Sequence, residues 1–200
     1  MTGFTIQRGF PAETRDTAAR LYWDAFGAKL ERVMGPEARA IRFFTETLDE
    51  SFALSAVGPD GTLLGLAGFK THEGSMTGGS FANMAAVYGV AGACWRVACL
   101  ALLEREVLRD VLLMDGICVA EPARGKGVGS ALLDAIMAEA AARNLPAVRL
   151  DVIDDNRRAR ALYERKGFVA QENTRLGPLR HVFGFERATA MRCPVSASTG

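Results

Sequence analysis

VAEPARGKGVGSALL, residues 119–133, joins a predicted strand to a predicted helix. An apolar run over residues 112–119 precedes it, and a helix-like stretch over 132–143 follows it. Arg124 is followed by glycines at positions 125, 127 and 129. A basic, glycine-rich turn of this kind typically holds phosphate groups, because glycine lets backbone N–H groups approach an anion and a helix N-terminus favours negative charge.

Two better-known phosphate-binding patterns fail on this stretch. The dinucleotide-binding pattern GxGxxG needs a glycine where Ser130 stands. The P-loop pattern GxxxxGK[ST] needs a glycine at Ala120 and a serine or threonine at Gly127. What remains is an arginine followed by alternating glycines, and by itself this also fits a tight strand-to-helix turn with two solvated cations.

A second motif downstream makes the interpretation more specific. LDVIDDNRRARALYERKGF, residues 150–168, predicts a strand, then Asn156, then a helix ending near Tyr163 and a Gly-Phe pair. The two motifs span about residues 112–168 and resemble those of the GNAT superfamily of acyl-CoA-dependent N-acyltransferases. In that family a strand, Arg/Gln-x-x-Gly-x-Gly/Ala and a helix are followed by a strand, an Asn and a helix with a Tyr.

The resemblance implies an α+β fold with a mixed, mostly antiparallel central sheet flanked by helices, and acetyl-CoA as cosubstrate. The pantetheine arm is expected between two splayed strands, beside the backbone of Ile117, Cys118 and Val119, with the Val119 N–H toward the thioester oxygen. Asn156 is expected to contact coenzyme A, and it is also a good helix N-cap. The residues expected around the pyrophosphate are Arg124, Gly125, Lys126, Gly127, Val128, Gly129 and Ser130.

The resemblance further implies N-acetyl transfer by direct attack of an amine on the thioester. Tyr163 stands at the family's usual general-acid position, and a phenol with a pKa of about 10 stays protonated at neutral pH. The helical spacing of Ala159, Leu162 and Tyr163 also fits an ordinary core role.

The general base is less well defined. Asp115 is the candidate, because period-two alternation puts it on one strand face with Ile117 and Val119. A structural carboxylate at a strand edge is an equal alternative. The same alternation turns Cys118 to the opposite face, so we do not expect an acyl-cysteine intermediate.

Composition excludes several other classes. The chain is 49% hydrophobic and 24% charged, which is typical of a globular domain. A net charge of +1 argues against a dedicated nucleic-acid binder. Four cysteines without CxxC spacing and two distant histidines argue against a disulfide framework and a metal site. Reduced cysteines and the lack of a signal-like N-terminus predict a cytoplasmic protein.

The predicted elements form one domain over residues 1–187, with a flexible tail over 188–200. They are a strand at 4–10, a helix at 12–26, a helix opened by Pro36, a hairpin at 51–69, a long helix at about 85–110, the strand–turn–helix unit, a strand at 147–153, a helix at 156–166 and a closing strand pair at 167–173 and 180–186.

The long helix is an insertion relative to the family pattern, within about forty residues from 71 to 111. Residues 84–103 contain one charge, Arg96, but their glycines and alanines lower the hydropathy, so we predict a mostly buried helix and no membrane span. The insertion has three open roles: covering the acceptor site, lining it, or forming a homodimer contact. The resemblance implies a primary amine of a small molecule or peptide as the acceptor. The alternative function is a non-catalytic acyl-CoA-binding or sensing domain.

Overall fold

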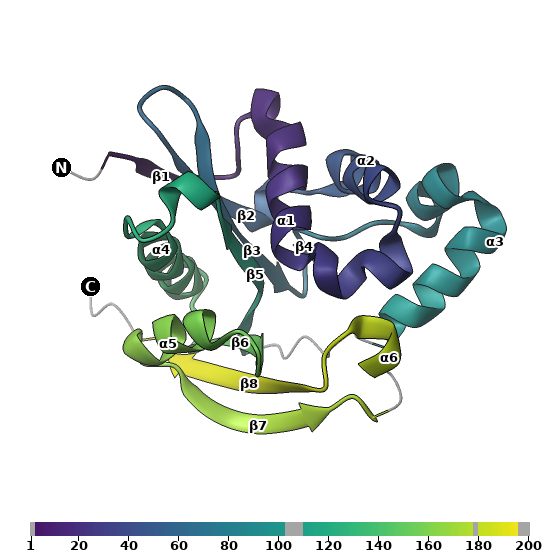
Figure 1. Ribbon diagram of the computed structural model, residues 1–200. Helices are drawn as coiled ribbons and strands as arrows, with labels where there is room; N and C mark the ends of the chain where they lie inside the picture. The colour runs from purple at the N-terminus through teal and green to yellow at the C-terminus, as the bar shows by residue number, and fades with distance from the viewer. Residues whose placement is uncertain (1–2, 103–109, 178–179, 196–200) are drawn as a thin grey trace.

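The computed structural model of the protein describes residues 3–102, 110–177 and 180–195. It has an eight-stranded sheet with helices on both faces (Figure 1). The strands are β1 (Thr5–Arg8), β2 (Ala53–Val57), β3 (Leu63–Thr71), β4 (Gly74–Ser75), β5 (Leu112–Val119), β6 (Ala147–Ile153), β7 (Val169–Arg175) and β8 (Arg187–Pro194). The helices are α1 (Arg15–Met34), α2 (Glu37–Thr47), α3 (Phe81–Ala101), α4 (Val128–Ala142), α5 (Arg157–Arg165) and α6 (Arg180–Phe183). The predicted α+β class is confirmed.

The sheet divides where its two central strands separate. Its order is β1-β2-β3-β5-β6-β8-β7, with β4 paired to β3. Among the strand pairs of the described residues, β5 and β6 alone are parallel, and they pair only at Leu112–Val148 and Leu113–Arg149. After Leu113, the edge of β5 that faces β6 has no strand partner among the described residues. The backbone N–H and C=O groups of β5 on this edge are therefore available to a ligand.

Two apolar cores cover the two faces of the sheet. On one face α1, α2 and α3 pack over residues such as Leu66 and Cys118. On the other face α4 and α5 pack over Leu112 and Met114. β5 therefore lies between both cores, which explains why its side chains are mostly apolar.

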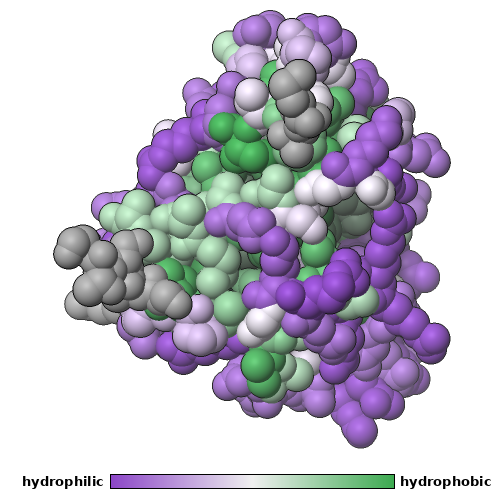
Figure 2. All heavy atoms as spheres, turned by 90° about the vertical axis from the view of Figure 1, so that its left-hand side faces the viewer, coloured by the Kyte–Doolittle hydropathy of each residue, from purple (hydrophilic) through white to green (hydrophobic). Residues whose placement is uncertain are grey.

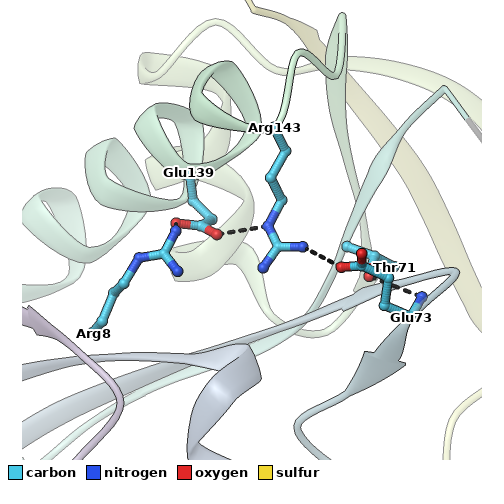
Figure 3. A network of polar contacts seen from close by, with 5 residues as sticks. All are labelled: Arg8, Thr71, Glu73, Glu139 and Arg143. Carbon is cyan, nitrogen blue, oxygen red and sulfur yellow. Dashed lines mark hydrogen bonds and ion pairs between the residues drawn. The ribbon is translucent and has the colours of Figure 1, made fainter.

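A buried carboxylate fixes α4 to the sheet. Glu139 of α4 is 5% exposed, accepts a hydrogen bond from Arg143 Nε (2.6 Å) and pairs with Arg8 of β1. Arg143 extends the network to Glu73 at 2.8 Å (Figure 3). A buried carboxylate needs such partners, since an unpaired charge in the interior is strongly destabilising. The network anchors the helix whose N-terminus carries the glycine turn.

The end of the chain differs from the sequence prediction. Residues 180–183, expected as a closing strand, form α6, and the closing strand is β8. β8 pairs with β6 along its length and with β7 on its other side. The prediction of a flexible tail is therefore wrong for residues 188–194, which pair with β6 and β7 in the sheet. Residues 196–200 lie outside the described part.

The prediction of a mostly buried long helix is also wrong. In α3 only Met84, Tyr88 and Ala93 are buried, and a positive φ of 73° at Gly89 kinks the helix. By length and composition α3 could cross a membrane, and only 17% of its most apolar 18-residue window is buried inside the protein. Residues 103–109 of the predicted helix lie outside the described residues.

The opposite side of the molecule does not share this exposure. On the side of α4, which faces the viewer in Figure 2, hydrophilic residues surround a band of apolar ones. Within the described residues, the large exposed hydrophobic side chains are absent from α4 and concentrate on α3.

Candidate active site

A cleft of about 1270 Å³ opens where β5 and β6 diverge. It is lined by α1, by the end of β5 and the glycine turn, by the start of α5, and by Gly184–Phe185 between α6 and β8. Five cationic and three acidic residues line it: Arg20, Lys29, Arg124, Arg158 and Arg165 against Asp24, Glu121 and Asp155. This excess of positive charge suits a polyanionic ligand.

The glycine turn forms one end of the cleft. Gly125 and Gly127 have φ values of +80° and +84°, which side chains with a Cβ rarely adopt. A Cβ at either position would meet nothing within 4 Å, so the space in front of the turn is open. Gly127 is the N-cap of α4, and the first intrahelical bond is donated by Ala131 N to Gly127 O (3.0 Å). The N–H groups of residues 128–130 are thus left for an anion, with the helix dipole in support.

The predicted turn residues do not all face this cleft. Arg124, Gly125, Gly127, Gly129 and Ser130 line it. The Lys126 and Val128 side chains, in contrast, line a separate cavity of about 370 Å³ beside Phe4. Gly129, unlike Gly125 and Gly127, has no positive φ, because it already lies inside the helix. Lys126 therefore adds charge near the turn without pointing into the cleft.

The end of β5 presents its backbone to the cleft. Ala120 donates its N–H to Leu64 O of β3 at 2.9 Å. Because successive residues of a strand direct their N–H groups to opposite sides, the Val119 N–H points away from β3, toward the diverging β6. Val119 O on the same side accepts a hydrogen bond from Arg124 Nε (3.1 Å). Ile117, Cys118 and Val119 all line the cleft, as predicted.

The start of α5 forms a further wall. Asn156 caps this helix, accepting a hydrogen bond from Ala159 N at 3.1 Å, and it also lines the cleft. The capping role is confirmed. Arg158, Leu162 and Arg165 of the same helix line the cleft as well. Their spacing of four and three residues places them on one helical face, and this spacing can be seen in the sequence.

Tyr163 lies behind this wall. It is 5% exposed, its ring centroid is 6.0 Å from that of Phe168, and burial raises its pKa to about 12. Its neighbour Leu162, rather than Tyr163, lines the cleft. The general-acid role stays a prediction.

Asp115 is not on the predicted face of β5. Gly68 pairs with Gly116 and Phe69 with Met114, so Asp115 is the extra residue of a β-bulge. Its Oδ2 accepts a hydrogen bond from Thr77 Oγ1 at 3.2 Å, and burial raises its pKa.

The bulge breaks the alternation on which the prediction of a shared face depended. Ile117 and Val119 pack toward the α4 core, whereas Asp115 lies near Tyr22 in the other core. The prediction that Asp115 shares a face with Ile117 and Val119 is therefore wrong. Cys118 does lie opposite Val119, and burial raises the pKa of its thiol to about 12.

The sequence motifs do not identify several residues that line the cleft. Asp24 and Lys29 of α1 and Phe185 before β8 line the cleft, although they lie far from both motifs in the sequence. No local pattern marks them, because the fold alone brings α1 and residues 184–185 to the same cleft.

Comparisons with known proteins agree with this geometry. Residues 15–168 match the model of the acetyltransferase (GNAT) family. A GCN5-related N-acetyltransferase from Kribbella flavida has a similar structure, with 17% identity, a TM-score of 0.65 and coverage of 96% of this chain and 98% of that one. Ard1 from Thermoplasma volcanium has 18% identity, a TM-score of 0.62 and the same coverages.

A phosphinothricin acetyltransferase from Sinorhizobium meliloti, in complex with AcCoA, is similar over 100% of this chain and 91% of that chain. It has 17% identity and a TM-score of 0.60. At these identities the likeness to solved structures concerns the fold.

Proposed function

Because the chain belongs to the acetyltransferase (GNAT) family, we propose that it transfers the acetyl group of acetyl-CoA to a primary amine of a small molecule or peptide while both substrates occupy the cleft. The observation that carries the proposal is the position of the α4 N-terminus and the glycine turn at one end of a cleft into which the free side of β5 opens.

Acetyl-CoA fits the turn end of the cleft. Gly125 and Gly127 leave open space against the N–H groups at the start of α4, which suits a pyrophosphate. Arg124, Arg158 and Arg165 supply the cations that a nucleotide with several phosphates needs. The similar structure from Sinorhizobium meliloti is a complex with AcCoA, which supports the same cosubstrate here.

The chain's own backbone supplies the stabilisation of negative charge. The Val119 N–H points into the gap between β5 and β6, where it is positioned to donate to the thioester oxygen as charge develops on it. The hydrogen bond from Arg124 to Val119 O holds this peptide in place.

Tyr163 is the proposed proton donor to the departing thiolate. A pKa of about 12 keeps its hydroxyl protonated throughout the neutral range. The ammonium first loses one proton to solvent, and the neutral amine then forms the C–N bond. The C–S bond breaks, the phenol proton passes to sulfur, and the second proton that the nitrogen loses returns to the phenolate through solvent. The buried thiol of Cys118, with its raised pKa, is a poor nucleophile, which favours direct transfer.

Release of free thiol from acetyl-CoA across an amine panel tests the proposal. We expect amine-dependent release by the wild type and a loss of about 10²-fold or more in kcat for Tyr163→Phe. Tyr88→Phe is the matched control, since Tyr88 is also buried with a pKa of about 12 but donates its hydrogen bond to Met34 O outside the cleft.

Two outcomes would contradict it. Acetyl-CoA binding without turnover on any amine would favour the non-catalytic sensing domain. Equal rates for the Tyr163 and Tyr88 variants would remove Tyr163 from the mechanism.

The side of α3 that carries the exposed Val90 and Val97 is the proposed homodimer contact. Within the described residues, five of the six large exposed hydrophobic side chains belong to α3 or its C-cap: Phe81, Val90, Trp95, Val97 and Leu102. The part of α3 that follows the kink, from residue 90 to 101, is about 18 Å long at 1.5 Å per residue.

A second copy suits this face better than a membrane surface. Helices that lie on membranes usually carry lysines and arginines on a polar face. The one charge of α3, Arg96, is instead held by Gly92 O and Gly35 O at 3.1 Å each and lies 3.9 Å from the Tyr88 ring centroid. The apolar, uncharged side of α3 that carries Val90 and Val97 is complementary to a copy of itself.

Sedimentation of the full chain tests this contact. A dimeric wild type and a monomeric Val90→Glu/Val97→Glu variant are expected, with Val169→Glu, the exposed valine on β7, still dimeric. A monomeric wild type, or a wild type that floats with phospholipid vesicles, would contradict it.

A further inference from the structure

A second cavity, of about 370 Å³, adjoins the glycine turn outside the cleft. It is enclosed by the residues before β1, by the start of β3 and by the stretch that leads into α4. β1 and α4 lie on the same side of the molecule (Figure 1). Four residues line both spaces and so form the partition between them: Leu63, Ala120, Pro122 and Ala123. A ligand in this cavity would contact the turn from outside the cleft.

The floor of the cavity is apolar. Leu63, Ala123 and Val128 line it and are buried, with exposed fractions of 3%, 4% and 1%. Phe4 and Leu64, which are partly buried and pack against the core under α4, line it as well. A hydrocarbon group on this floor is removed from water, which is the main favourable term in the binding of such groups.

The cavity contains one charge. Lys126 is the single charged residue of the described lining, and its side chain is exposed. Among the described residues it forms no ion pair. One cation matches one negative charge, whereas groups with several charges are better matched by the arginines of the cleft. An apolar floor with one lysine above it therefore suits an amphipathic monoanion.

Backbone hydrogen bonds hold the walls of the cavity in place. Ala120 donates its N–H to Leu64 O at 2.9 Å, which joins the turn to β3. Ala123 N donates to Ala120 O at 2.9 Å, and Gly58 N donates to Thr62 O at 2.8 Å. The cavity is thus formed before a ligand binds, as is usual for small-molecule sites, and its volume lies within their range of about 300–1,000 Å³.

We propose that this cavity binds a medium-chain monocarboxylate, with its hydrocarbon chain on the apolar floor and its carboxylate beside Lys126, while acetyl-CoA occupies the cleft. The carboxylate stays at the exposed rim, so it keeps part of its hydration and its desolvation costs little. The site gives a role to Lys126, whose side chain points out of the cleft. It does not depend on the proposed acetyl transfer.

An NMR titration of the CoA-loaded full chain with octanoate tests the site. We expect shifts of the backbone amides of Leu64, Ala123 and Lys126, with those of Asn156 and Phe185 in the cleft unchanged. The Kd should fall about three- to fourfold for each CH₂ group added between butanoate and octanoate, because each group is buried on the floor. 1-Octanol, which lacks the charge, should bind about three- to tenfold more weakly.

Variants separate the charge from the apolar floor. Lys126→Met should raise the octanoate Kd about three- to tenfold and leave that of 1-octanol unchanged. Lys166→Met is the matched control, because Lys166 pairs with Asp134 and does not line the cavity.

A third variant fills the cavity. Thr62 is exposed and lines the cavity but not the cleft, so Thr62→Trp should abolish the binding of octanoate and 1-octanol and keep the acetyl-CoA Kd. Leu64→Phe fills the same space from β3 and should act in the same way.

Three results would overturn the proposal. Displacement of octanoate by CoA, or a weaker affinity for acetyl-CoA in Thr62→Trp, would make the cavity part of the cosubstrate site. Amide shifts at Asn156 and Phe185 would place octanoate in the cleft. Equal Kd values for octanoate, 1-octanol and octylamine would show an apolar depression that does not select an anion.

Discussion

The two ends of the cleft are built in different ways. The end at the glycine turn comes from one continuous stretch, from Val119 to Ser130, in which the strand, turn and helix follow each other. The other end joins α1 to Gly184–Phe185, segments about 150 residues apart in the sequence. A local motif thus builds the end of the cleft that is proposed for acetyl-CoA, whereas only the tertiary fold builds the opposite end. Changes at the two ends should therefore affect different kinetic constants.

The largest effect is expected from Gly127→Val. A β-branched residue at φ +84° costs about 1–2 kcal/mol or more, and relieving that strain turns the peptide away from the anion. We expect a rise in the acetyl-CoA Kd on the order of 100-fold, measured by calorimetry.

Gly129→Ala is the control for this change. A Cβ at Gly129 would make ordinary contacts with Leu162 (3.5 Å) and Val119 (3.7 Å), so acetyl-CoA binding should change little. Equal losses in both variants would mean that bulk near the turn, rather than the left-handed backbone, determines affinity.

A smaller effect is expected from Arg124→Ala. The variant loses one cation of the cleft and the hydrogen bond to Val119 O, so the acetyl-CoA Kd should rise about tenfold. Arg160→Ala, in which the removed residue pairs with Glu164 outside the cleft lining, should leave it unchanged. A change in the KM for the amine, with an unchanged Kd for acetyl-CoA, would contradict the assignment of Arg124 to the acetyl-CoA end of the cleft.

The smallest effect on activity is expected from Asp115→Asn, because Asp115 lies in the β-bulge and does not line the cleft. Burial raises the pKa of Asp115 in the folded state above the ordinary value of about 3.9. Below about pH 4 the carboxyl group is protonated in both the folded and the unfolded state and does not destabilise the fold. As the pH rises through the folded-state pKa, the buried group becomes charged and the fold loses stability.

The asparagine variant should therefore have a Tm that is higher by about 2–4 °C at pH 7, as for a gain near 1 kcal/mol, and nearly equal to the wild type at pH 4. Thermal unfolding at both pH values checks this. A large loss of kcat at an unchanged Tm would restore Asp115 as the base.

The sequence allowed the turn end to be predicted because its signals are local. Arg124, the glycines and Asn156 act through the backbone of the segment in which they stand, and the structure places these residues around the cleft, although Lys126 points elsewhere. The bulge at Asp115 was not predictable from period-two alternation, since one extra residue reverses the face without changing composition.

Exposure and pairing were harder to predict. The apolar composition of α3 indicated a helix but could not show that its outer face is left uncovered. The small residues of β8 resemble a tail, and only the neighbouring strands β6 and β7 make them a strand. Lys29 and Phe185 meet only in the fold.

The most direct test of a cleft that holds both substrates is a matrix of initial rates over the concentrations of acetyl-CoA and of an amine that supports turnover. Double-reciprocal plots that intersect are predicted, because the amine attacks the thioester while both are bound. Parallel lines, the pattern of an acetylated enzyme intermediate, would contradict direct transfer.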